Sequence, residues 1–91
     1  MKETKDSLKR FGQALRQRRE ACGLTRDDLV DHMSTLASER YPDRRVPDVS
    51  TVARWERGKQ CPRRFHLRLV CEVLQVKPEE LGYPKPIRRW P

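Results

Sequence analysis

Glycines and prolines divide this 91-residue chain into segments that are each long enough for one short helix and for little else. Gly23 and Gly58 interrupt the apolar pattern, and so do the prolines, for example Pro42 and Pro47. Glycine commonly ends a helix and proline cannot continue one, so these residues mark element boundaries. Between them the apolar residues recur at helical spacing, with no strand-like alternation. The sequence therefore predicts an all-α fold, a compact bundle of five short helices.

Capping residues fix most of the expected helix boundaries. Thr25 with Asp28 forms a capping-box pattern, and Asp48 is a typical N-cap residue. Residues 1–7 are predicted to be a flexible N-terminus, and residues 83–91 a basic, proline-rich tail. We expect helices over residues 8–22, 26–40 and 49–57, a fourth with Pro62 at its first position, and a short fifth that opens at Pro78.

The charge balance favours a polyanionic partner. Lysine and arginine number 21 against 13 aspartate and glutamate, a net charge of +8, which suits nucleic acid better than an anionic membrane surface. The chain has no long apolar run and no secretory signal, so we expect no membrane association. Its three cysteines include no CxxC pair, which argues against a disulfide framework and fits the reducing cytoplasm.

Residues that could carry out chemistry are few. Cys61, His66 and Cys71 match no familiar zinc spacing. No Ser–His–Asp arrangement, phosphate-binding glycine loop or paired carboxylate site is recognisable. We therefore predict that the protein is not an enzyme and uses no metal, no cofactor and no small-molecule ligand.

One charged residue on the first helix requires a partner. At about 100° per residue, Arg19 projects into the apolar stripe between Leu15 and Cys22. A buried guanidinium is strongly unfavourable unless an acidic group meets it. The sequence therefore predicts a buried carboxylate opposite Arg19.

Two stretches of the chain together form a recognisable pattern. They consist of Phe11-Gly12-Gln13-Ala14-Leu15, Arg19, Gly23-Leu24-Thr25-Arg26-Asp27-Asp28-Leu29, Ser50-Thr51-Val52-Ala53-Arg54-Trp55-Glu56-Arg57-Gly58-Lys59, Pro62 and Leu74-Gln75-Val76-Lys77-Pro78-Glu79-Glu80-Leu81-Gly82. With these residues the chain resembles the phage-repressor (Cro/CI, also called XRE) helix-turn-helix DNA-binding family over residues 8–82. The resemblance implies a five-helix fold that binds double-stranded DNA at a specific operator, commonly as a homodimer on a palindromic operator.

The chain departs from the family pattern between the two helices of the motif. Leu29 and Trp55 lie further apart than usual, so we expect an insertion at about residues 36–47 that extends the second helix and its loop. The arginine-rich loop and the 79–83 segment are similar to those of repressor-like proteins from actinobacteria. The tight turn that normally joins the two helices is then absent.

The resemblance also implies roles for individual residues. The helix at 49–57 is the recognition helix, which enters the major groove, and Arg19 forms a structural ion pair with Glu56. Base contacts are expected from Val49, Ser50, Thr51 and Arg54, of which Arg54 suits guanine. DNA backbone contacts are expected from Arg26, Arg44, Arg45, Arg57, Lys59, Arg63 and Arg64. Arg44 and Arg45 fit solvated loop charges equally well.

The sequence thus predicts a transcriptional regulator that acts by occupying an operator, in the bacterial cytoplasm and associated with the nucleoid; whether it activates or represses is left open. The alternative is a protein-interaction module, antitoxin-like or adaptor, that uses the same fold. Such a surface should be apolar at positions 49, 50 and 54, whereas only Val49 is apolar there, which favours DNA. An RNA-binding protein would need an aromatic stacking platform, and the chain shows none.

Overall fold

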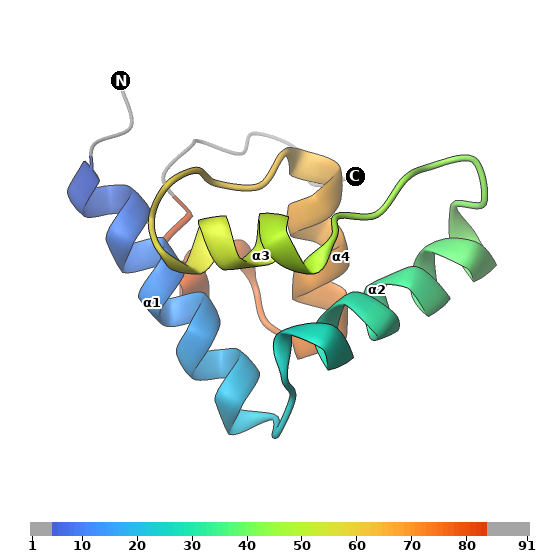
Figure 1. Cartoon of the computed structure of the whole chain (residues 1–91), viewed down its shortest axis with the longest axis horizontal. Helices are drawn as coiled ribbons and strands as arrows, with labels where there is room; N and C mark the ends of the chain where they lie inside the picture. Colours follow the sequence, from blue (N-terminus) through green and yellow to red (C-terminus); the bar gives the residue numbers. More distant parts are fainter. Residues whose placement is uncertain (1–4, 84–91) are drawn as a thin grey trace.

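The structure is a computed structural model that describes residues 5–83. They form α1 (Lys5–Ala21), α2 (Arg26–Arg40), α3 (Val49–Glu56), α4 (Arg64–Leu74) and a 3-10 turn, η1 (Pro78–Leu81). In Figure 1, α3 lies across the middle of the molecule between α1 and α2, with α4 behind it. Helix α1 packs against α3 and η1, and α2 packs against α3 and α4. No strand occurs within residues 5–83, so the all-α prediction is confirmed.

Two helices begin where their caps predict. At the start of α2, the backbone N–H of Asp28 donates to Thr25 Oγ1 at 3.0 Å, and the N–H of Thr25 donates to the Asp28 carboxylate. At the start of α3, the N–H of Thr51 donates to Asp48 Oδ1 at 2.8 Å. Hydrogen bonds from the Thr51 hydroxyl and backbone N–H hold the pKa of Asp48 below its usual value. Each cap satisfies a backbone donor that the helix itself leaves unpaired.

The other boundaries differ from expectation. Helix α1 begins at Lys5, so residues 5–7, which we assigned to a flexible terminus, are helical. Helix α4 begins at Arg64 rather than at Pro62, which is buried and whose carbonyl accepts a hydrogen bond from the Tyr83 hydroxyl at 2.7 Å. The predicted fifth helix is the 3-10 turn η1, which Gly82 ends with a positive φ of 65°. Apart from Tyr83, the predicted tail at 83–91 lies outside the described residues, as do residues 1–4.

A small core joins all of these elements. Its largest fully buried side chains are Phe11, Leu15, Leu29, Met33, Val52, Trp55, Pro62, Leu67, Leu69, Val70 and Leu81.

Two cysteines lie on either side of the limit of this core. Cys22 is exposed, so the apolar stripe of α1 ends before it. Cys71 is buried, and burial raises the pKa of its thiol to about 12.

None of the helices in residues 5–83 has the length and apolar character needed to cross a lipid bilayer.

The backbones of α1 and α3 meet at Gly12. A Cβ atom built at Gly12 would lie 2.5 Å from the carbonyl oxygen of Glu56 and closer still to that of Trp55. These distances are too short for any side chain, and both obstacles are backbone atoms. Only glycine therefore permits α1 to cross the C-terminal end of α3 at this separation.

Candidate nucleic-acid interface

Helix α3 is held by one face and exposed on the other. Val52 is 0% exposed and Trp55 is 1% exposed, and both belong to the core. Ser50 and Arg54 are exposed, one helical turn apart, while Val49 and Thr51 are half-buried. The predicted base-contacting residues thus lie on the outer surface or at its edge. This outer surface ends in the guanidinium of Arg54, which is suited to hydrogen bonding with an acceptor on a partner.

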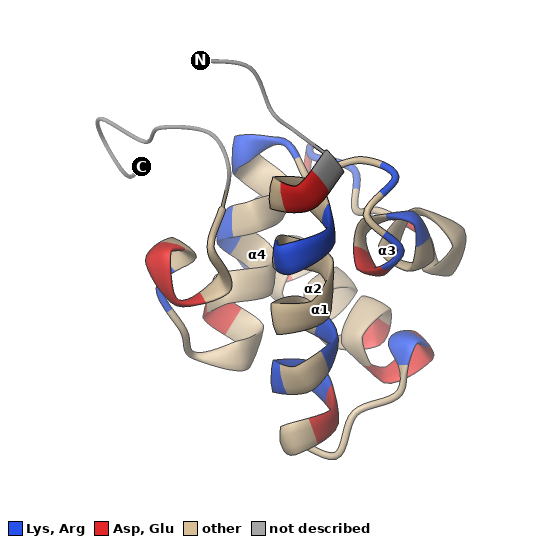
Figure 2. Cartoon of the chain, turned by 90° about the vertical axis from the view of Figure 1, so that its left-hand side faces the viewer, with Lys and Arg blue, Asp and Glu red and all other residues tan. Residues whose placement is uncertain are grey.

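A group of exposed cations follows α3 in the chain. In Figure 2, Lys and Arg colour parts of α3 and of the segment that leads away from it. Two backbone hydrogen bonds hold this segment on the end of α3, from Gly58 N to Trp55 O at 3.1 Å and from Lys59 N to Arg54 O at 2.9 Å. The exposed cations between the end of α3 and the start of α4 are Arg57, Lys59, Arg63 and Arg64.

The segment 41–48, which connects α2 with α3, rests on α4. The Tyr41 ring meets Phe65 edge-on, with ring centroids 5.2 Å apart, and Arg44 Cζ lies 4.1 Å from the Phe65 centroid on α4. The side chain of Arg44 is therefore engaged within the protein through a cation–π contact. Arg45 is exposed. Of the two arginines in this segment that we expect near the DNA backbone, Arg44 contacts an aromatic ring and Arg45 shows no such contact within residues 5–83.

His66 joins this segment to the core. Its Nε2 lies 3.3 Å from the carbonyl oxygen of Arg45, and its ring centroid lies 6.0 Å from that of Trp55. Burial of the ring lowers the pKa of His66 below its usual value. The folded state thus favours the neutral imidazole over the imidazolium.

This pKa shift predicts a pH dependence of stability. The stabilisation by His66 is fully present above the unfolded-state pKa of about 6.5 and is lost as the pH falls through the lower folded-state value. Between pH 8 and pH 5, we expect the melting temperature of the wild type to fall more than that of His66→Phe. Thermal melts at several pH values measure this difference. Parallel pH profiles for the two proteins would contradict the prediction.

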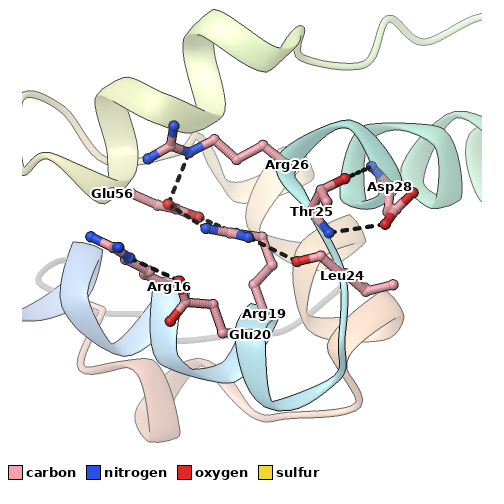
Figure 3. Close-up of polar contacts among 8 residues, drawn as sticks. All are labelled: Arg16, Arg19, Glu20, Leu24, Thr25, Arg26, Asp28 and Glu56. Atoms are coloured by element: carbon pink, nitrogen blue, oxygen red, sulfur yellow. Dashed lines mark hydrogen bonds and ion pairs between the residues drawn. The ribbon is translucent and has the colours of Figure 1, made fainter.

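A buried ion-pair cluster lies where α1, α2 and α3 meet (Figure 3). Arg19 Nε and Nη2 donate to the two carboxylate oxygens of Glu56, at 2.7 and 3.0 Å. Arg19 Nη1 also donates to the carbonyl oxygen of Leu24 at 2.8 Å. The side chains of Arg19 and Glu56 are only 8% and 1% exposed. The structure thus supplies the buried carboxylate that Arg19 requires, and the side-chain hydrogen bond to Glu56 raises the pKa of Arg19.

Glu56 also binds a second arginine, which sequence reasoning did not anticipate. Arg26 Nε donates to Glu56 Oε1 at 3.0 Å, and the Arg26 side chain is 34% exposed. We had assigned Arg26 to a DNA phosphate because it begins α2. The only signal in the sequence was indirect: a carboxylate buried among so many arginines can accept from more than one of them.

The family comparison agrees with this architecture. The helix-turn-helix domain family matches residues 10–82, and the chain therefore belongs to this family. It is a Cro/CI-like family, and membership indicates DNA binding and a role in transcription regulation. No curated protein and no solved structure matches the chain. Within residues 5–83, no group of His, Cys, Asp or Glu is arranged to hold a metal ion.

Proposed function

We propose that the protein binds double-stranded DNA in a sequence-specific manner, as a transcriptional regulator, and that α3 is its recognition helix. The observation that carries this proposal is the division of α3 into two faces. Val52 and Trp55 anchor it in the core, and Ser50 and Arg54 face outward. An α-helix fixed in this way fits the major groove, where each base pair presents a distinct pattern of donors and acceptors.

Arg54 is the proposed base reader. Its guanidinium carries parallel donors that match O6 and N7 of guanine. Ser50 and Thr51 carry hydroxyl groups that suit either base or phosphate, and Val49 offers an apolar contact for a thymine methyl group. These four positions are proposed to read the sequence, and in a homodimer two copies of α3 would lie on a palindromic operator. This assignment is supported by the exposure of α3 and by the family.

The exposed cations after α3 are the proposed phosphate contacts. Arg57, Lys59, Arg63 and Arg64 lie on one continuous stretch of chain beside the recognition helix. Four such contacts correspond to a slope of roughly −4 in a plot of log affinity against log salt. Arg45 is a further candidate, whereas Arg44 and Arg26 already have partners within the protein.

The proposal is tested by selecting bound sequences from a pool of random duplexes. We expect enrichment of a motif with two-fold symmetry, because a homodimer presents the same α3 twice. Competition with a scrambled duplex of equal composition then measures the preference. Failure of every selected duplex to compete better than its scrambled control would refute sequence-specific binding. A chain that prefers no duplex but binds a partner protein would favour the interaction-module alternative.

Two substitutions should separate base reading from phosphate binding. Arg54→Ala is expected to reduce discrimination between the selected and scrambled duplexes by about 1–3 kcal/mol, because it removes a bidentate base contact. Arg63→Ala is expected to weaken binding to both duplexes by the same factor and to make the salt slope less steep by about 0.9. Fluorescence titrations at several salt concentrations measure both effects. Equal losses on the two duplexes for both variants would contradict this division of roles.

A further inference from the structure

The connection between α2 and α3 does not itself fix the angle between these helices. Segment 41–48 contacts α4 through Tyr41 and Arg44, which both pack on Phe65. The N–H of Arg44 donates to the carbonyl of Tyr41, so the start of the segment turns back on itself. A tight turn would couple the direction of the two helices directly, whereas this longer segment is fastened to a third element. The orientation of α3 against α2 must therefore be set by other contacts.

The contact between Arg26 and Glu56 meets this requirement. Arg26 is the first residue of α2, and Glu56 is the last residue of α3. The hydrogen bond between them, 3.0 Å from Nε to Oε1, therefore joins the N-terminus of α2 to the C-terminus of α3 (Figure 3). It acts at the end of α3 that is opposite to segment 41–48.

The side chain of Glu56 is buried and held in place by hydrogen bonds. Its carboxylate is 1% exposed and is held by two hydrogen bonds from Arg19 on α1. The backbone at Glu56 also lies against Gly12, which like Arg19 belongs to α1. A side chain bound to this carboxylate is therefore bound to the crossing of α1 and α3, and Arg26 extends that crossing to α2.

We propose that Arg26 is a positioning residue for α3: by binding Glu56 it holds the recognition helix at a fixed angle to α2 and so increases sequence discrimination. This inference rests on the proposed function. A phosphate contact at the same residue would act differently. It would strengthen binding to every duplex alike and add to the salt dependence, whereas the orientation of α3 matters only where bases are read.

The test compares Arg26→Gln with Arg63→Gln on the selected and scrambled duplexes. Glutamine at position 26 removes the charge but keeps a long side chain with a favourable helix propensity. Thermal melts establish that both variants are folded. For Arg26→Gln we expect the preference for the selected duplex to fall by roughly tenfold, because a charge-assisted hydrogen bond is lost. The salt slope should stay unchanged. Arg63→Gln should lower both affinities equally and make the slope less steep by about 0.9.

A second measurement does not involve DNA. In the free protein, Arg26→Gln should speed amide hydrogen exchange several-fold at the C-terminal end of α3, for example at the amide of the C-cap residue Arg57, which donates to the carbonyl of Ala53. The α4 amides of Leu67 and Val70 should be unchanged. Unchanged exchange in α3 would overturn the inference. Equal loss on both duplexes with a less steep salt slope would also overturn it and make Arg26 a phosphate contact. If the wild type prefers no duplex, the proposed function fails, and the exchange rates still decide whether Arg26 holds α3.

Discussion

Replacing Gly12 with alanine is expected to lower the free energy of unfolding by about 3 kcal/mol, near the upper end of the overpacking range. Alanine ordinarily stabilises the interior of a helix relative to glycine by about 1 kcal/mol. Here the added Cβ would lie 2.5 Å from the carbonyl oxygen of Glu56. Because the obstacle is backbone, α1 and α3 must move apart to admit it. Thermal melts should show a fall of roughly 15 °C.

Two controls separate this clash from other effects. Gln13 is exposed on the same helix, so Gln13→Ala should change the melting temperature little. Gly23 has a φ of 74° but no atom within 4 Å of the added Cβ, so Gly23→Ala introduces only backbone strain of about 1–2 kcal/mol. A melting temperature for Gly12→Ala equal to that of Gln13→Ala would show that α1 and α3 are not in backbone contact.

Replacing Glu56 with alanine is the second change with a large expected effect. It leaves Arg19, whose side chain is 8% exposed, without its carboxylate in the core. Removing one partner of a buried ion pair typically lowers the free energy of unfolding by about 3–5 kcal/mol, since the remaining charge stays buried and uncompensated. Denaturant unfolding monitored by tryptophan fluorescence and circular dichroism measures the loss.

An exposed ion pair provides the comparison for Glu56. Arg18 and Glu80 form a pair at 3.2 Å with side chains 48% and 42% exposed. Solvent screens such a pair, so Arg18→Ala, which leaves the cap of η1 by Glu80 intact, should cost less than about 1 kcal/mol. If Glu56→Ala unfolded at the same denaturant concentration as Arg18→Ala, the carboxylate of Glu56 would have no structural role.

Local signals in the sequence predicted much of the fold. The caps at Thr25 and Asp48 interact with residues within one helical turn, and the structure contains both interactions. Pro62, which the sequence predicts to open α4, instead lies outside the helix, and its carbonyl accepts from the hydroxyl of Tyr83, far along the chain. A pattern read over neighbouring residues carries no information about such a contact. The same limit applies at Gly12, where the close approach of α3 depends on residues distant in the chain.

Part of the candidate site was predictable, because it too depends on local patterns in the sequence. Burial of Arg19 within an apolar stripe requires an acid, and that requirement is visible from periodicity alone. The position of Arg26 beside Glu56 depends on how α2 approaches α3, which no local pattern specifies. The exposure of Ser50 and Arg54 follows from the helical register that buries Val52 and Trp55. Their contacts with bases stay predictions.

The attachment of segment 41–48 to α4 has an evolutionary consequence. Tyr41 and Arg44 fasten this segment to Phe65, away from the crossing of α1 and α3 at Gly12. Mutations that lengthen, shorten or recharge the segment therefore leave that crossing undisturbed. On the proposed function, descendants of this chain can acquire new contacts with neighbouring nucleotides by altering one connecting segment, while the contacts proposed to orient α3 are inherited intact.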